Sequence, residues 1–206
     1  MSRIVILAVS LVFLLVRPAF ALDAVEAEHL VRSAITDATT WFAGGGMTRE
    51  QTRAKVTALV EKYADIGYES EMLLGRYWRK ASPEQQKSFS DLLIPYFVAT
   101  YGEMIDGAPE SPKIEFGNTE PSEGGSFLVH TMLRPVGEEP IKLDWNIVTA
   151  PSGKVVVADV MADGVAMVTT IKADFTAVIR AGGGKLDPLL VAMRKKITDA
   201  ENQPSR

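Results

Sequence analysis

The alternation of apolar and polar residues predicts a β-hairpin in the C-terminal half of the chain. Residues 141–147 alternate with a period of two, and Leu143, Trp145 and Ile147 share the apolar face. Residues 154–161 contain a β-branched run that is apolar on both faces, which predicts an inner strand covered on two sides. The proline and glycine at 151–153 favour a turn between the two strands.

After a break at 162–164 the apolar period changes to that of a helix. One helical face then carries an apolar stripe: Met167, Val168, Ile171, Phe175, Val178 and Ile179. A hairpin that leads directly into an amphipathic helix predicts a sheet with a helix packed on it.

Capping signals predict further helices before the hairpin. Helices should begin after Asp23, Thr48 and Ser82, each of which is followed three residues later by Glu or Gln. A shorter helix is expected from Glu69 to about residue 78. Glycines at 44–46 should end the first helix, and those at 182–184 should end the helix after the hairpin.

The helix after Ser82 has the longest apolar stripe, and a proline lies inside it. Pro83 suits the first helical position, whereas Pro95 removes one backbone hydrogen bond. The sequence leaves two alternatives open, a bent helix or two helices that meet at Pro95. The stripe is Phe89, Leu92, Leu93, Tyr96, Phe97, Tyr101, Met104 and Ile105.

Two more strands are expected before the hairpin, at 113–116 and 127–133, with turns at 120–125 and 137–140. A final helix should start at Asp187. The pattern therefore predicts an α+β fold, with several helices packed on a twisted antiparallel sheet of about four strands and an apolar cavity between them.

The first residues have the pattern of a secretory signal. Arg3 precedes an apolar run at 4–16, and Ala-Phe-Ala at 19–21 matches a cleavage site. We expect cleavage after Ala21, export to the periplasm, and a single domain at 22–206. The alternative is an uncleaved anchor, but the run is shorter than the about 20 residues of a transmembrane helix.

Charge and cysteine content narrow the classes of function. The chain has 22 Lys and Arg against 26 Asp and Glu, and removal of Arg3 and Arg17 leaves 20, for a net charge of −6. Because no basic excess remains, we expect no nucleic-acid partner. The chain contains no cysteine, so an exported product would depend on its core rather than on disulfides.

No catalytic set is evident in the sequence. The only histidines are His29, expected on a helix surface, and His130, expected on a strand. We therefore predict no metal site, no cofactor and no catalytic residue. Asp144 or Asp159 could serve as a strand carboxylate in a cavity, but we expect Asp144 to face water and Asp159 to cap the turn to Gly164.

Several helices and the sheet each carry an apolar face. Such faces usually form only a core, but here they could equally leave a cavity between sheet and helices, a common place for a ligand. The candidate lining residues are Leu74, Phe89, Leu93, Phe97, Tyr101, Phe127, Val129, Leu143, Trp145, Ile147, Val157, Val165, Val168 and Phe175.

Two segments resemble those of a known family. Residues 74–79, Leu-Gly-Arg-Tyr-Trp-Arg, followed by 82–89, are similar to the Gly-Arg-Tyr-Trp segment of the MlaC-type (toluene tolerance) family of periplasmic lipid-binding proteins. Residues 159–175 resemble its Asp-Val…Gly-Val-Ser-Leu-Val…Phe segment. The resemblance covers essentially the mature chain and implies a phospholipid as ligand.

The sequence also departs from that family. Ala166 stands where many members have Ser, and Ile171 and Lys172 stand where many have Tyr and Arg. The ending at 180–194, with its three glycines, is closer to the hopanoid-associated HpnM branch, which would change the ligand to a polycyclic lipid.

The resemblance also implies partners: an inner-membrane ABC transporter complex and an outer-membrane lipoprotein complex that exchange the lipid. Arg76 and Arg79 should anchor the local structure or dock a partner, because a guanidinium can bind carbonyls or carboxylates. Two other classes of function stay open, an enzyme that uses Asp144 or Asp159 and a periplasmic adaptor without a ligand.

Overall fold

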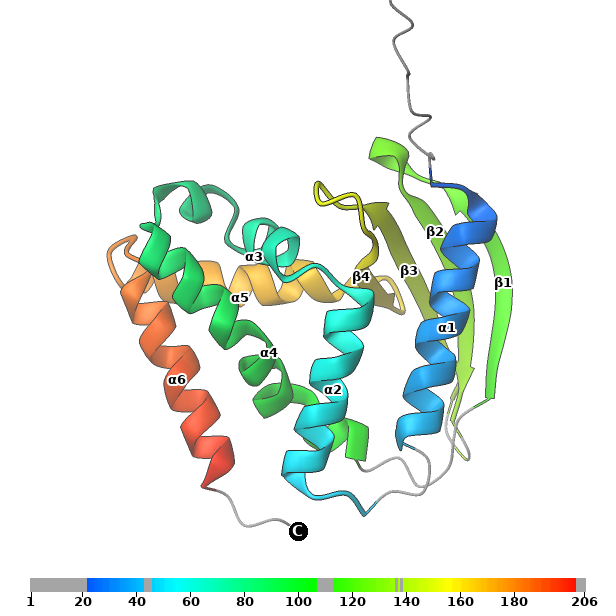
Figure 1. The fold of residues 1–206 in the computed structure, drawn as a ribbon, viewed down its shortest axis with the longest axis horizontal. Helices are drawn as coiled ribbons and strands as arrows, with labels where there is room; N and C mark the ends of the chain where they lie inside the picture. Colours follow the sequence, from blue (N-terminus) through cyan, green and yellow to red (C-terminus); the bar gives the residue numbers. More distant parts are fainter. Residues whose placement is uncertain (1–21, 43–45, 107–112, 136, 138, 203–206) are drawn as a thin grey trace, which may run out of the picture.

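The computed structural model describes residues 22–42, 46–106, 113–135, 137 and 139–202, and it confirms the α+β prediction. A sheet crossed by one helix lies beside a group of further helices (Figure 1). The elements are α1 (Ala24–Phe42), α2 (Arg49–Tyr63), α3 (Ile66–Leu74), the 3-10 helix η1 (Gly75–Lys80), α4 (Pro83–Asp106), β1 (Lys113–Pro121), the 3-10 helix η2 (Glu123–Gly125), β2 (Phe127–Arg134), β3 (Ile141–Thr149), β4 (Val155–Ala162), β5 (Val165–Ala166), α5 (Met167–Ala181) and α6 (Asp187–Glu201).

The predicted helix starts are confirmed at three places. Asp23 Oδ1 accepts the Glu26 amide at 2.8 Å. Thr48 and Gln51 form a reciprocal capping box, and so do Ser82 and Gln85. Each box satisfies amide groups that a helix leaves without an internal partner. The predicted stop at 44–46 includes residues 44 and 45, which lie outside the described part of the chain.

The short helix before Ser82 differs from the prediction. It starts at Ile66 rather than Glu69, because Asp65 Oδ1 caps it by accepting the Tyr68 amide at 3.0 Å. Gly75, at φ 51°, ends α3, and the chain continues as the 3-10 helix η1. Beyond Ser82, α4 runs through Pro95 as one helix, which decides between the two alternatives left by the sequence.

The sheet is antiparallel, with the strand order β1-β2-β3-β4-β5. It has a fifth strand, β5, which pairs only with the end of β4 at Met161 and Ala162. β1 is longer than predicted and reaches Pro121 opposite Phe127, so the turn predicted at 120–125 begins too early. A shift in register between Phe116 and Thr119 interrupts β1, and an edge strand accepts both a bulge and a terminal proline.

The buried side chains form two core clusters. The sheet cluster joins Leu22 and α1 to the sheet through Ala27, Val31, Val129 and Ile147. The helical cluster joins α3, η1, α4, α5 and α6. In β4, Val156 is fully buried while Val155 and Val157 pack against the sheet cluster, so both faces of this strand are covered as predicted.

Candidate functional site

The indole ring of Trp145, in the sheet cluster, is fixed by hydrogen bonds. Its indole Nε1 donates to Thr131 Oγ1 at 2.9 Å, and Thr131 Oγ1 donates to the Leu143 carbonyl at 3.2 Å. Thr131 is buried, so this chain of bonds satisfies the only polar atom of the indole and fixes the ring plane. The rest of the ring is apolar surface and remains half-buried at the edge of the cluster.

The helical cluster is centred on three aromatic rings. Phe89 and Phe175 are fully buried and meet edge to face, with ring centroids 5.6 Å apart. Tyr96 meets Phe175 in a similar geometry at 5.4 Å. Edge-to-face pairs are a favourable arrangement of aromatic side chains, so this contact holds α4 against α5.

The structure divides the predicted lining residues between these clusters. Leu74, Phe89, Leu93 and Phe175 are buried in the helical cluster, with Val168 half-buried beside it. Val129 and Ile147 are buried in the sheet cluster, where Phe127, Trp145 and Val157 are half-buried. Four residues lie outside both clusters. Phe97 and Tyr101 contact each other with tilted rings whose centroids are 4.8 Å apart, Leu143 is half-buried, and Val165 on β5 is 63% exposed.

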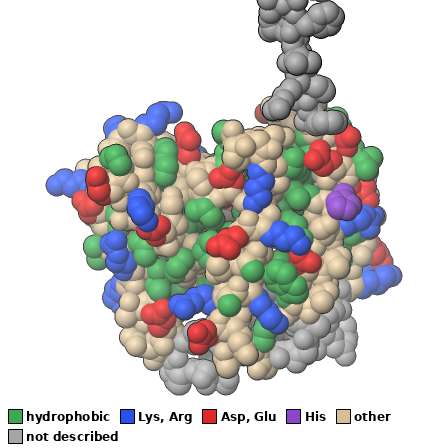
Figure 2. Space-filling model, in the orientation of Figure 1, with side chains coloured by type: hydrophobic (Ala, Val, Ile, Leu, Met, Phe, Trp, Pro, Cys, Tyr) green, Lys and Arg blue, Asp and Glu red, His purple; other side chains and the backbone are tan. Residues whose placement is uncertain are grey.

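Large apolar side chains on both layers are therefore only half-buried. From the sheet these are Phe127, Leu143 and Trp145, and from the helices Phe97, Tyr101 and Val168. In the face drawn in Figure 2, hydrophobic side chains gather near the middle of the molecule. Full burial of an exposed side chain of this size is worth about 1.5–3 kcal/mol, and a bound apolar ligand would add the part of this that the half-buried side chains have not yet gained.

The prediction that Asp144 faces water was wrong. Its carboxylate is buried and pairs with His130 Nδ1 at 2.5 Å and with Lys142 Nζ at 2.8 Å. Burial opposes ionisation of Asp144, but the bonds from Lys142 and His130 outweigh it and lower the carboxyl pKa. His130 Nε2 in turn faces Glu120 Oε1 at 3.3 Å. Both oxygens of Asp144 and both ring nitrogens of His130 have partners in this network.

Asp159 acts at a helix start rather than at the turn to Gly164. Its Oδ1 accepts the amides of Val160 at 2.8 Å and Val168 at 3.0 Å. Ala166 occupies the N-cap position of α5 and provides no side-chain cap. The Asp159 carboxylate therefore caps an amide at the start of α5 although residue 166 offers no side-chain oxygen.

Sequence reasoning missed Glu69, the most perturbed acid in the described chain. Burial, followed by the negative charges of Asp159 and Asp65, raises the Glu69 pKa to about 8. Its Oε1 is buried without a hydrogen-bond partner, as is Oδ1 of Asn146, which lies opposite Asp159 in the sheet. Segment 66–74 carries two acids, Glu69 and Glu71, and its sequence does not show which of them is buried.

The described residues contain no group of three or more His, Cys, Asp or Glu side chains suited to a metal ion. His29 is exposed, as predicted. In the same part of the chain, no helix has both the length and the apolarity to cross a membrane.

Comparison with known proteins identifies the class. The model of the MlaC protein family matches residues 35–195, so the chain belongs to the MlaC family. The fold is similar to that of a phospholipid-binding protein from Ralstonia solanacearum, solved in complex with a phospholipid. The two chains share 23% identity with a TM-score of 0.72, over 85% of this chain and 99% of that one.

Proposed function

We propose that the protein is an exported, periplasmic lipid-binding protein that carries a lipid between membrane complexes. The observation that carries the proposal is the set of large apolar side chains left half-buried on both the sheet and the helices. Membership of the MlaC family and the phospholipid bound by a protein of the same fold support it. An apolar space between the layers would hold acyl chains, at about 0.8 kcal/mol for each CH₂ removed from water.

Binding rather than catalysis agrees with the polar groups of the sheet. The candidate base Asp144 is committed to His130 and Lys142, and Asp159 is committed to the amides at the start of α5. We propose a phospholipid as the ligand, with a hopanoid as the alternative suggested by the C-terminal sequence. An inner-membrane transporter complex and an outer-membrane lipoprotein complex are the proposed partners.

Mass spectrometry of lipid extracted from the natively purified protein tests the proposal directly. We expect phospholipid at close to one molecule per chain. A polycyclic lipid would favour the hopanoid alternative, and protein that carries no lipid from any membrane extract would contradict the proposal.

A filling substitution tests the position of the space. Val168 is half-buried at the edge of the helical cluster, so Val168→Trp should occupy the apolar space, displace lipid and leave the melting temperature close to that of the wild type. In a packed core the same change would cost about 1–3 kcal/mol. Val191→Trp is the matched control, because Val191 on α6 is 63% exposed. Unfolding of the Val168 variant, or lipid at the wild-type level, would contradict this placement.

A further inference from the structure

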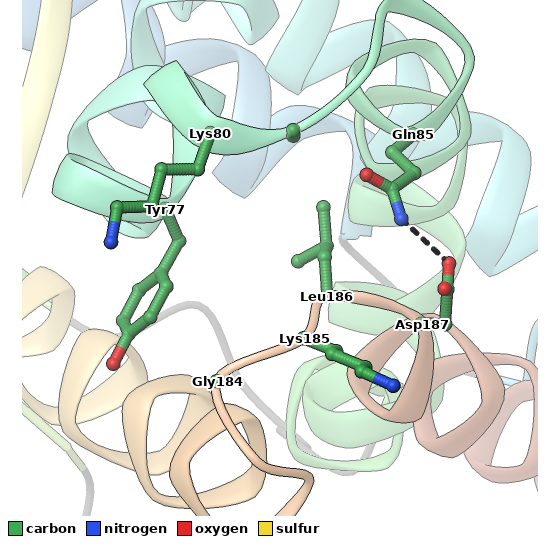
Figure 3. A pocket seen from close by; sticks show the side chains of 8 residues that line it. Tyr77, Lys80, Gln85, Gly184, Lys185, Leu186 and Asp187 are labelled. Carbon is green, nitrogen blue, oxygen red and sulfur yellow. Dashed lines mark hydrogen bonds between the residues drawn. The ribbon is translucent and has the colours of Figure 1, made fainter.

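A small pocket lies between η1 and the turn that joins α5 to α6, apart from the apolar residues discussed above. It has a volume of about 220 Å³ and is lined by Tyr77, Lys80, Ala81, Gln85, Gly184, Lys185, Leu186 and Asp187 (Figure 3). Drug-sized ligands occupy pockets of about 300–1,000 Å³, so this one suits a small group.

Two guanidinium groups lie near the Tyr77 hydroxyl, beside this pocket and outside its lining. Arg76 Nη2 donates to the hydroxyl at 2.9 Å, and its guanidinium carbon lies 4.9 Å from the centre of the Tyr77 ring. The hydrogen bond from Arg76 lowers the pKa of this hydroxyl, burial opposes the shift, and the nearby Arg180 acts in the same direction as Arg76. Arg180 comes from the last turn of α5, so two separate elements supply the two cations.

More positive charge surrounds the two arginines. Lys80 and Lys185 line the pocket itself. The ammonium group of Lys172 lies beside Gly75, the residue before Arg76. A Cβ atom added to Gly75 would be 3.4 Å from Lys172 Nζ.

These cations are not neutralised within the described part of the chain. None of Arg76, Lys80, Lys172, Arg180 and Lys185 forms an ion pair with a described acid. Asp187 is the one carboxylate in the pocket wall, and its Oδ1 accepts a hydrogen bond from Gln85 Nε2 at 2.8 Å, as Figure 3 shows. These five side chains are exposed, so in a chain with a net charge of −4 they form a local positive field that attracts anions.

We propose that Arg76 and Arg180, at the Tyr77 hydroxyl beside this pocket, bind a phosphate group with the help of Lys80 and Lys185 from the pocket wall. Guanidinium groups match phosphate oxygens with paired hydrogen bonds, and the phenol hydroxyl of Tyr77 can donate one more. The phosphate could belong to a lipid headgroup or be free in solution. The site does not depend on the proposed lipid cavity, because it shares no residue with the half-buried apolar set.

The test compares the full-length mature protein with the double variant Arg76→Gln/Arg180→Gln. The control Arg194→Gln/Lys196→Gln removes the same charge from exposed positions further along α6. Melting temperatures without added anion show first that each variant folds. Inorganic phosphate is then titrated by calorimetry against sodium chloride of equal ionic strength, and flotation with phosphatidylglycerol vesicles is measured in parallel.

We expect the wild type and the control variant to bind the anion saturably. The Arg76→Gln/Arg180→Gln variant should bind it more than tenfold more weakly. Loss in the phosphate arm identifies free phosphate as a sufficient ligand, and loss in the vesicle arm alone identifies a lipid phosphate. The proposal would be overturned if phosphate gave no more binding heat than chloride and if the Arg76→Gln/Arg180→Gln variant bound vesicles as well as the control variant does. Preferential binding of polyglutamate would also overturn it, in favour of an acidic protein partner.

Discussion

At the residue scale, Glu69 is a largely buried acid whose Oε1 has no hydrogen-bond partner in the described part of the chain. Its carboxyl is largely removed from water and lies near Asp159 and Asp65, so burial and then like charge disfavour its ionised form. No described group donates a hydrogen bond to its buried Oε1. The folded protein therefore keeps Glu69 protonated to higher pH than the unfolded chain does.

This difference predicts a specific dependence of stability on pH. The Glu69 pKa is about 8 in the folded state against an ordinary value of 4.5, so the folded state binds the proton more tightly between these values. The free energy of unfolding should fall as pH rises through this window, by up to about 1.4 kcal/mol per pH unit. Glu69→Gln should remove this slope and stabilise the protein at pH 8.

Denaturant unfolding at pH 5, 6.5 and 8 measures the effect. Glu71→Gln is the matched control, because Glu71 is exposed on the same helix and has no described partner. If the two variants show the same pH dependence as the wild type, Glu69 is ionised in the folded protein and the assigned environment is wrong.

Sequence reasoning succeeds at this scale where the interaction is local. The capping residues Asp23, Thr48 and Ser82 bind amides three residues away, so the pattern of residues is sufficient to predict them. Asp144 was misplaced because its partner His130 lies 14 residues away on the neighbouring strand. Strand register, which the sequence does not show, brings the two together.

At the element scale, the start of α5 depends on a residue outside the helix. The N-cap residue Ala166 has no side-chain oxygen, and Asp159 from β4 supplies the acceptor for the Val168 amide instead. This arrangement ties β4 to α5, two elements joined by a short turn. Loss of a helix cap costs about 0.5–2 kcal/mol.

A rescue experiment tests this arrangement. Asp159→Ala should destabilise the protein by about 1 kcal/mol, and adding Ala166→Ser should recover part of the loss by restoring a cap within the helix. Thermal unfolding at pH 6 measures both, since Glu69 is then largely protonated in the folded state and its repulsion with Asp159 is small. Ala166→Ser in the wild type is the control and should change little. The absence of any recovery would mean that Asp159 acts through contacts other than the cap.

Periodicity predicted the elements better than it predicted their ends. The hairpin of β3 and β4 was evident because its apolar pattern is long, whereas the sequence left open whether the stripe around Pro95 was one helix or two. β1 was predicted too short because its second half, after Phe116, is polar and is held by pairing with β2 rather than by an apolar face. The helix starting at Ile66 depends on one aspartate cap, a weaker signal than a capping box.

At the scale of the whole molecule, the two core clusters were not predictable from periodicity. It assigns Phe89, Phe175, Trp145 and Val168 to apolar faces but does not show which faces meet. The structure places the first two in a packed aromatic contact and leaves the others half-buried. Packing between layers depends on side-chain shape and strand twist, so the lining of a ligand space needs three-dimensional information.

The predicted cleavage site lies next to a residue of the core. Leu22, the residue after the predicted cleavage site, is buried in the sheet cluster with Ala27 and Val31 of α1. Cleavage after Ala21 would therefore leave an N-terminal residue that contributes to the core, whereas a cut further along would remove it. N-terminal sequencing of the exported protein should read Leu-Asp-Ala-Val, and a chain that retains residues 4–16 would contradict the prediction.

A substitution connects this cleavage site to stability. Leu22→Ala in the exported protein should lower the free energy of unfolding by about 1–3 kcal/mol, because it removes apolar contacts with the sheet cluster. Val25→Ala is the matched control, since Val25 is 78% exposed at the start of the same helix and its truncation should cost little. If both changes lowered the free energy of unfolding by the same amount, Leu22 would contribute no more to the core than an exposed residue. The core would then give no reason for cleavage to occur before Leu22.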